Sequence, residues 1–490
     1  MRVRLFFKWL VPGVSAGLLA YLAVIIWANA MMRLVAPHAV KPWGIATLVL
    51  TGLLVVETLA LGMRRLWPLA MGTTLGLGLE WLPRALPAAG VLILGALFFT
   101  WWTVQRHQTQ IGRTRGVPRP VRLTVQERFL HLHVLGPTGS GKSSSVLMPL
   151  IGQDLRHRYG ILVIEPKDDL TEAAYRQALA CGRRVIRFNP LDPDCPHYNP
   201  LAGSPDGAAE GIATALAQLG DAGHPYYQMA SRIQLLYSVR ALKGALGDQA
   251  DLGALLTFLR DLRWQKEIVF SLDDASVRQY FQEQWARSAS QSREERQGLI
   301  YRLELLWANS ALSRTLKAPH DFVWDDVLAE SWVVLASLSL AELGQSARAL
   351  GILLWHGLAQ ATYRRRPNEA HPPFFVYLDE FQEWVSDDLS HFLALARGYR
   401  VGLTLAHQDL GQLNPPLVEA VLANARQRVI LPGTAASDVA RFQESFAPYR
   451  LAVPLRYLSQ GLAVVQLTQR GRLRPPVIVR LPYFPLGGAR

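Results

Sequence analysis

The stretch "FLHLHVLGPTGSGKSSS", residues 129–145, decides the fold class of this chain. Residues 129–135 alternate and favour β structure, so they predict a strand that leads into a glycine-rich turn. Residues 136–143 fit the spacing G-x-x-x-x-G-K-S, in which backbone N–H groups surround phosphate oxygens. Since the motif requires a strand before the turn and a helix after it, the stretch predicts an α/β domain that binds ATP.

The residues of this loop have distinct expected parts. Lys142 supplies a positive charge for the β and γ phosphates, and the Ser143 hydroxyl ligates Mg²⁺. A helix beginning near Ser143 directs the positive end of its dipole at the same anion. The residues expected to bind the nucleotide are Gly136, Pro137, Thr138, Gly139, Ser140, Gly141, Lys142, Ser143 and Ser144.

A second acidic site is expected at the end of a neighbouring strand. "PFFVYLDEF", residues 373–381, is an apolar run that ends in Asp379 and Glu380. Asp379 is the candidate for holding Mg²⁺, and Glu380 is the candidate for orienting the attacking water. A further run, residues 402–408, ends in His407 and Gln408, of which Gln408 is better suited to sensing the γ-phosphate. Catalytic roles are therefore expected for Lys142, Glu380 and Gln408.

Several other runs favour strands and alternate with helical stretches, which indicates a mainly parallel sheet covered by helices. They are residues 159–170, 183–188, 331–339, 426–433 and 462–467. The first of these ends in polar residues, Glu165, Lys167, Asp168 and Asp169, which are expected at the same edge of the sheet as the nucleotide.

Residues 1–104 have a different composition, with long apolar runs and few charges. No charged residue lies between Lys8 and Arg33, and further apolar runs cover 42–63, 66–82 and 85–104. A run of roughly 20 apolar residues is long enough to cross a bilayer. Basic residues before the first run and after the last predict that both ends lie inside. An even number of crossings follows, four being favoured and two remaining open.

The charge of the chain is concentrated near these apolar runs. The formal net charge is +13, of which residues 1–104 carry +6 and residues 105–128 carry +5. The remainder carries about +2, so the high charge is mainly a membrane-flank signal. Contact with DNA would require local patches, for which Arg364–Arg366 and Arg470–Arg474 are the candidates. The two cysteines fit neither a metal motif nor a disulfide framework.

Five stretches together resemble the coupling proteins of type IV secretion, which are membrane-anchored ATPases of conjugative DNA transfer. They occur in the family's order and spacing, although the family's acidic-Pro-Lys stretch usually starts with Asp where this chain has Glu165. The stretches are "HLHVLGPTGSGKSSSVLMPLI", "ILVIEPKDDL", "RRVIRFNPLDPDCPHYNPL", "PFFVYLDEFQEW" and "ARGYRVGLTLAHQDLGQL".

The resemblance implies a RecA-like P-loop NTPase domain with an inserted all-α domain, preceded by N-terminal transmembrane helices. It places the anchor at 1–104, a basic juxtamembrane linker at 105–128, the RecA-like domain at 129–204 and 326–490, and the helical insert at 205–325. It also implies a homo-hexamer, in which an arginine of one subunit acts on the nucleotide of its neighbour. Arg397 is the first candidate, and Arg426 and Arg428 are the others.

The implied function is delivery of single-stranded DNA with its bound relaxase into a type IV secretion channel. The implied location is the bacterial inner membrane, with several crossings and the ATPase domain in the cytoplasm. The implied partners are DNA, relaxosome proteins, channel components and the lipid bilayer. Export of effector proteins, pumping of duplex DNA and an ATP-gated docking scaffold without enzyme activity remain alternatives. A cassette exporter is disfavoured because no cassette signature precedes Asp379.

Overall fold

A sheet of eleven strands organises the part of the chain that the computed structural model describes. That part comprises residues 108–219, 225–286, 289–385, 388–449 and 455–486, within the unit Gln105–Arg490. The expected anchor, residues 1–104, lies outside the described residues. Among the residues described, no helix has both the length and the apolar character needed to cross a bilayer.

The strands follow the order β2-β1-β13-β10-β9-β3-β8-β7-β4-β6-β5 across the sheet. From β9 to β5 all neighbours are parallel, whereas β10, β13, β1 and β2 extend one edge in antiparallel fashion. Their bounds are β1 (Thr109–Thr114), β2 (Pro120–Leu123), β3 (Leu132–Leu135), β4 (Gly160–Glu165), β5 (Val185–Phe188), β6 (Val333–Ser337), β7 (Phe374–Asp379), β8 (Val401–His407), β9 (Gln427–Ile430), β10 (Leu462–Gln466) and β13 (Val477–Arg480). A separate hairpin pairs β11 (Thr468–Gln469) with β12 (Arg472–Leu473).

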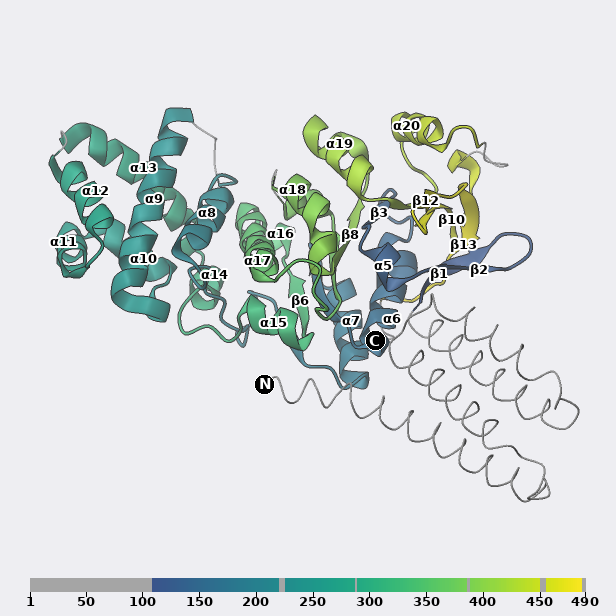
Figure 1. Ribbon diagram of the computed structural model, residues 1–490, viewed down its shortest axis with the longest axis horizontal. Coiled ribbons are helices and arrows are strands. Elements are labelled where there is room, and N and C mark those ends of the chain that lie inside the picture. The colour runs from purple at the N-terminus through teal and green to yellow at the C-terminus, as the bar shows by residue number, and fades with distance from the viewer. Residues whose placement is uncertain (1–107, 220–224, 287–288, 386–387, 450–454, 487–490) are drawn as a thin grey trace, which may run out of the picture. The chain divides into compact units, whose positions relative to one another are not determined.

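Helices cover both faces of the parallel strands (Figure 1). One face packs against the phosphate-loop helices η1 (Lys142–Leu147) and α6 (Met148–His157) and against α7 (Asp169–Ala180). The other face packs mainly against α17 (Gln345–Arg364), α18 (Leu389–Leu395), α19 (Pro415–Asn424) and α20 (Ala436–Phe446). Shorter elements are α5 (Val125–Arg128), α15 (Trp324–Glu330), α16 (Leu340–Leu343), η3 (Phe381–Glu383), η4 (Ala396–Tyr399), η5 (Leu410–Gln412) and η6 (Leu455–Tyr457).

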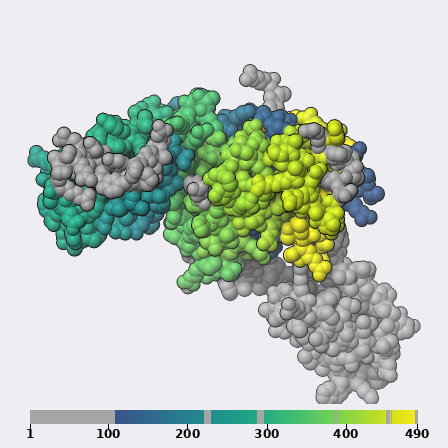
Figure 2. Space-filling view, turned by 90° about the horizontal axis from the view of Figure 1, so that it is seen from above, coloured from purple at the N-terminus to yellow at the C-terminus, as the bar shows by residue number. Residues whose placement is uncertain are grey.

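A region of consecutive helices follows β5 and precedes α15. Figure 2 shows this region, in teal, gathered at one end of the described unit. Its buried apolar side chains belong to the same hydrophobic core as those on the α17 face of the sheet, so apolar packing holds it against the sheet domain. The helices are α8 (Pro205–Leu216), α9 (Pro225–Leu246), α10 (Leu252–Arg260), α11 (Leu262–Ser271), α12 (Ala275–Ala286), α13 (Ala289–Trp307) and α14 (Ser310–Thr315), with a short turn η2 (Gly247–Gln249).

Each strand predicted from an apolar run is confirmed, because each run contains one strand of the sheet. The interpretation of residues 105–128 as a linker is wrong for most of its length. Residues 109–123 pair as β1 and β2 and join the edge of the sheet, and α5 follows. The strands were missed because arginines occupy much of this stretch. Within the two strands, Ile111 and Leu123 are the large apolar side chains that are buried.

A buried polar cluster connects α5, which follows the β1–β2 hairpin, to the rest of the sheet domain. The Arg128 guanidinium forms an ion pair with Asp154 on α6, and it also donates to Tyr377 Oη at 2.8 Å. Tyr377 Oη in turn donates to Asp154 Oδ2 at 2.6 Å. The guanidinium carbon lies 3.6 Å from the centre of the Phe375 ring. All these groups are buried away from water. The hydrogen bonds and the ion pair between them therefore offset the free-energy cost of burying each polar group.

Replacement of Asp154 by alanine tests this cluster. The change leaves the Arg128 charge buried without its carboxylate, which is expected to cost about 3–5 kcal/mol. The midpoint of thermal unfolding should therefore fall by roughly 5–15 °C. The control is Glu172→Ala, which removes a partly exposed carboxylate 3.6 Å from Arg176 and 3.3 Å from Arg187 and should shift the midpoint little. If the unfolding midpoints of the two variants fell equally, Asp154 would not be needed to offset the buried charge of Arg128.

Candidate nucleotide site

The glycine-rich loop lies at the carboxyl end of β3, where the chain turns into η1. Gly139 and Gly141 have φ angles of 79° and 96°, which side chains other than glycine rarely adopt. Gly136 N donates to His407 O at 3.2 Å, so the start of the loop is tied to the end of β8. A Cβ atom on Gly136 would lie 2.7 Å from Leu431 Cβ, which explains why this position also requires glycine.

The loop closes around the side chain of Lys142. Its Nζ donates to Gly136 O at 2.7 Å and lies 3.4 Å from Glu380 Oε1. The side chain is 6% exposed, so its charge is held in a confined space beside the loop N–H groups. This is the position from which a lysine can contact the β and γ phosphates of a nucleotide.

Ser143 and Asp379 meet across the adjoining strands. Ser143 Oγ donates to Asp379 Oδ2 at 2.8 Å. Burial raises the pKa of the Asp379 carboxyl, and the hydrogen bond from Ser143 acts in the opposite direction. Asp379 Oδ1 is buried and has no hydrogen-bond partner among the described residues. A buried carboxylate oxygen without a donor is well suited to a cation.

The donor set fits Mg²⁺ in particular. Mg²⁺ takes oxygen ligands and is commonly held by one or two carboxylates together with substrate phosphates. Ser143 Oγ and the Asp379 carboxylate provide oxygen atoms at the edge of the phosphate loop. The described residues contain no cluster of three or more His, Cys, Asp or Glu side chains suited to a metal, so no all-protein cage is offered there.

Glu380 follows Asp379 in a left-handed backbone conformation, with φ 50° and ψ 55°. This conformation is uncommon for a residue with a Cβ, and such residues gather at functional sites. Trp384 Nε1 donates to Asp379 O at 2.6 Å and so fixes the turn from behind. The Glu380 carboxylate accepts from Gln408 Nε2 and Gln382 Nε2, each at 3.2 Å. Its position between Lys142 and Gln408 suits a group that orients water beside a γ-phosphate.

Gln408 and His407 face different surroundings. Gln408 reaches Glu380, whereas the His407 ring is buried against His133, with the two Nε2 atoms 2.6 Å apart. Burial lowers the pKa of His407 to about 3, so this ring stays neutral at physiological pH. The preference for Gln408 over His407 therefore agrees with their placement, and its role remains a prediction.

Arg397 does not join the other predicted residues within its own chain. It is exposed in η4, which precedes β8, while Gln408 follows the same strand. The seven residues of β8 separate the two by roughly 20 Å. Arg428 is engaged by Ser445 Oγ at 3.1 Å and Leu422 O at 2.8 Å, and Arg426 also lies at the amino end of its strand.

The candidate DNA patch at the end of α17 is largely engaged in local contacts. Arg364 binds Asp325 through two hydrogen bonds of 3.1 and 2.6 Å. Arg365 donates to Leu328 O at 2.6 Å and Tyr399 O at 3.3 Å. Structural roles therefore account for these two arginines.

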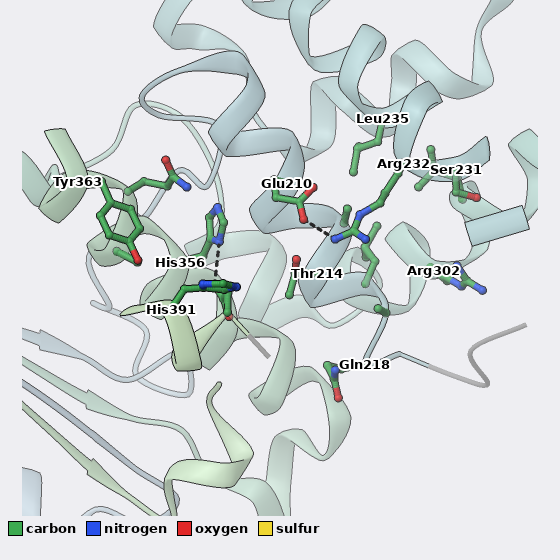
Figure 3. A pocket seen from close by; sticks show the side chains of 17 residues that line it. Glu210, Thr214, Gln218, Ser231, Arg232, Leu235, Arg302, His356, Tyr363 and His391 are labelled. Atoms are coloured by element: carbon green, nitrogen blue, oxygen red, sulfur yellow. Dashed lines mark hydrogen bonds and ion pairs between the residues drawn. The ribbon is translucent and has the colours of Figure 1, made fainter. Parts of the chain in front are cut away.

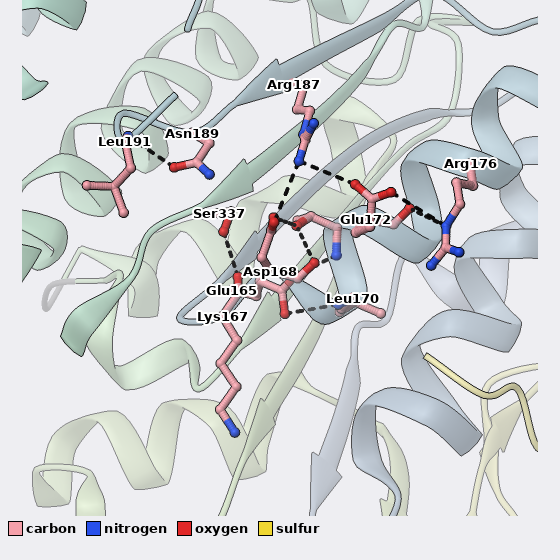
Figure 4. Close-up of polar contacts among 11 residues, drawn as sticks. Glu165, Lys167, Asp168, Leu170, Glu172, Arg176, Arg187, Asn189, Leu191 and Ser337 are labelled. Atoms are coloured by element: carbon pink, nitrogen blue, oxygen red, sulfur yellow. Dashed lines mark hydrogen bonds and ion pairs between the residues drawn. The ribbon is translucent and has the colours of Figure 1, made fainter. Parts of the chain in front are cut away.

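The polar residues at the end of β4 and directly after it form a cluster of hydrogen bonds and ion pairs (Figure 4). β4 and β7 are neighbours, so Glu165 and Asp379 end adjacent strands. The Glu165 carboxylate accepts from the backbone N–H groups of Leu170, at 3.3 Å, and Thr171. It thus caps the start of α7. Arg187 lies 3.6 Å from Asp168 and 3.3 Å from Glu172.

A separate hollow of about 550 Å³ lies between the helical region and α17 (Figure 3). Its polar lining includes Glu210 paired with Arg232, and His356, whose Nε2 lies 3.0 Å from Gly207 O. The residues that line it belong to α8, α9, α13, α17 and the chain around α18. The hollow is therefore distinct from the phosphate loop.

Sequence reasoning missed the residues that shape the acidic turn. Gln382 and Trp384 hold Glu380 and Asp379 in place, yet neither belongs to a motif that indicates such a task. Their proximity to the acidic pair along the chain was the available signal. His133 could have been suspected only from its place in the buried strand before the loop.

The strand order and the glycine-rich loop after β3 define an α/β protein with a P-loop motif in a RecA-like, largely parallel sheet. The chain belongs to the family described as type IV secretory system conjugative DNA transfer, whose model matches residues 105–417. The resemblance inferred from the five motifs is thereby confirmed. No curated protein sequence matches the chain.

Solved structures share the fold at low sequence identity. The unbound bacterial conjugative coupling protein TrwB, in the form named TrwBdeltaN70, is 15% identical, with a TM-score of 0.55 over 78% of this chain and 91% of that solved chain. TrwB with a non-hydrolysable ATP analogue is 16% identical, with a TM-score of 0.56 over 77% and 90%. VirB4 of Thermoanaerobacter pseudethanolicus is 15% identical, with a TM-score of 0.52 over 77% and 96%. At these identities the likeness establishes the shared fold.

The titration of Glu165 predicts a pH dependence of stability. Burial raises the pKa of this carboxyl from 4.5 to about 8. The folded chain therefore retains a proton that the unfolded chain releases, and the resulting stabilisation is full below about pH 4.5 and lost as the pH rises toward 8. Glu165→Gln removes this titration, so its unfolding midpoint should improve relative to wild type between pH 5 and about 8.5.

The control for this measurement is Glu172→Gln, because Glu172 is partly exposed and sits on the same helix that Glu165 caps. Its difference from wild type should vary little over the same interval. A difference between wild type and Glu165→Gln that stays constant with pH would show that Glu165 is ionised throughout.

Proposed function

We propose that this chain is an inner-membrane ATPase that couples ATP hydrolysis to the delivery of single-stranded DNA, with its bound relaxase, into a type IV secretion channel. The observation that carries the ATPase part is the meeting of Lys142 with Glu380 and of Ser143 with Asp379 at one edge of the sheet. Family membership supports the transfer part. TrwB, which shares the fold, has been solved with an ATP analogue and with ADP and Mg²⁺.

The residues divide the task of hydrolysis among them. The loop N–H groups and Lys142 bind the β and γ phosphates, and Ser143 with Asp379 holds Mg²⁺, which supplies charge neutralisation for the transferred phosphate. Glu380 orients the attacking water and accepts a proton from it as the water attacks the γ-phosphate. Gln408, hydrogen-bonded to Glu380 at 3.2 Å, adjusts that carboxylate when the γ-phosphate is present.

Lys142→Ala and Glu380→Gln distinguish binding from hydrolysis. Lys142→Ala should lose nucleotide binding and activity together, because it removes the charge inside the loop. Glu380→Gln should retain ATP binding and lose activity by roughly 10²- to 10⁴-fold, because it removes the carboxylate that orients water. Binding and steady-state hydrolysis of the purified full chain provide the measurement.

Glu383→Gln is the matched control, since Glu383 lies in the same turn but pairs with Arg348. It should leave hydrolysis nearly unchanged. If Glu380→Gln kept wild-type turnover, the role given to Glu380 would be wrong, and a chain that bound ATP without hydrolysing it would favour the docking scaffold.

Arg397 acts in trans within a homo-hexamer under this proposal. Its place at the amino end of β8, remote from Lys142 of the same chain, leaves it available to a neighbouring subunit. An arginine supplied in this way stabilises the charge that develops on the transferred phosphate.

Mixing two inactive variants tests this arrangement. Arg397→Ala should bind ATP but lose hydrolysis by roughly 10³-fold or more, and Lys142→Ala should fail to bind. Assembled together, they should regain part of the activity, because some interfaces pair an intact Lys142 site with an intact Arg397. Arg263→Ala is the control, since Arg263 is exposed on α11 beside Glu267. Absence of any recovery in mixed assemblies would contradict action in trans.

Cargo and domain limits complete the proposal. Residues 1–104 anchor the chain in the membrane with about four crossings, residues 129–204 and 326–490 form the cytoplasmic motor together with β1, β2 and α5, and residues 205–325 form the helical insert. Stimulation of hydrolysis by single-stranded DNA would support DNA as cargo. Stimulation by duplex DNA alone would favour a duplex translocase, and hydrolysis indifferent to DNA would favour export of effector proteins.

A further inference from the structure

The last part of the described chain is fastened along the phosphate-loop helix. Residues 481–486, called here the C-terminal strap, follow β13 without regular secondary structure. Leu481 N donates to Gly461 O and Phe484 N donates to Ser144 O, each at 2.9 Å. Arg176 Nη2 on α7 donates to Leu486 O at 3.5 Å. The strap is therefore anchored at its start, at its middle and near its end.

The sequence of the phosphate helix creates the middle anchor. The helix begins as a π-helix, in which Met148 N donates to Ser143 O. The next bond in this register would come from residue 149, which is proline and has no N–H group. The carbonyl of Ser144 instead accepts from Phe484 N. The strap thus completes the hydrogen bonding of the helix that begins at Lys142.

The placement of the acidic site relative to the loop indicates the direction in which a bound nucleotide would extend. Lys142, Glu380 and Gln408 place the γ end toward β8 and β7, on one side of β3. A nucleotide bound with its γ-phosphate there would extend its α-phosphate and nucleoside past β3 toward the side of the sheet that holds β9, β10 and β13. On that side Gln460 Nε2 lies 3.4 Å from Gly139 O, and the strap crosses the helix at Ser144.

One aromatic ring of the strap is free to meet a ligand. The Phe484 side chain is partly buried against the core that η1 and α6 share. Tyr483, next to it, is 74% exposed. Covalent geometry and the Phe484–Ser144 bond place Tyr483 Cα within roughly 5–6 Å of Ser144 O. Exposure of an aromatic ring this close to the phosphate helix is what a stacking platform for a base requires.

We propose that the C-terminal strap forms the nucleoside-binding wall of the site, with the Tyr483 ring stacking on the base. This inference rests on the nucleotide binding proposed above and adds the part of the ligand that the loop does not contact. Stacking reads the face of a base and not its edge, so adenine and guanine nucleotides are both accepted.

The test compares nucleotides with a ligand that has no base. Binding of ATP, GTP and inorganic tripolyphosphate is measured, each with Mg²⁺, on the purified full chain. Tyr483→Ala should weaken ATP and GTP by roughly 5- to 100-fold and leave tripolyphosphate unchanged. Tyr483→Trp should restore nucleotide binding. Tyr301→Ala is the control, because Tyr301 is also exposed but lies on α13 in the helical region.

The outcomes separate this inference from the proposed function. Wild-type affinity for ATP in Tyr483→Ala would overturn it, as would an equal loss of ATP and tripolyphosphate, which would show that the strap acts on the phosphate loop. Equal affinity of the wild type for ATP and tripolyphosphate would also overturn it. A wild-type chain that bound neither ligand would refute the proposed ATPase and the strap inference together.

Discussion

The site depends on the parallel pairing of β3, β8 and β7 in one fixed register. Leu135 pairs with His407, and Asp379 pairs with Ala406, so three strands end at the same edge. A slip of one residue in a buried strand would turn its apolar side chains to the wrong face. The apolar packing on both faces of the sheet therefore sets where Asp379, Glu380 and Gln408 meet the phosphate loop.

Buried contacts beneath the loop hold this arrangement rigid. The His133 and His407 rings stack with their centres 4.9 Å apart, one from each strand that borders the loop. Burial lowers the pKa of both rings, so neither introduces a charge under the phosphates. The Gly136–His407 backbone bond connects the same two strands. A loop that is already ordered before a phosphate binds loses less conformational entropy on binding, so its affinity for the phosphate is higher.

The sequence predicted which residues the strand ends bring together, while the roles of these residues remain predictions. Lys142, Asp379, Glu380 and Gln408 each follow an apolar run, and parallel strands bring such positions together whatever their separation along the chain. The same rule could have placed Arg397 at the opposite edge, since it precedes its strand. The edge strands β1 and β2 escaped notice because arginines and prolines obscure their alternation.

Other features depend on tertiary geometry that no local pattern carries. The grip of Trp384 on Asp379 O and the left-handed turn at Glu380 become visible only when the strands are in place. The C-terminal strap is more than 300 residues from Ser144 along the chain. Its anchor arises from a missing N–H group at Pro149, which a sequence reading records only as a helix position.

A structure of the full chain with Mg²⁺ and a non-hydrolysable ATP analogue addresses the central claim most directly. The expected result is one nucleotide in the loop, with Lys142 Nζ in contact with the β and γ phosphates. Mg²⁺ is expected beside Ser143 Oγ and the Asp379 carboxylate, and the Glu380 carboxylate is expected to face the γ-phosphate. A nucleotide bound elsewhere, or one bound in the loop with Asp379 and Glu380 turned away from it, would contradict the account.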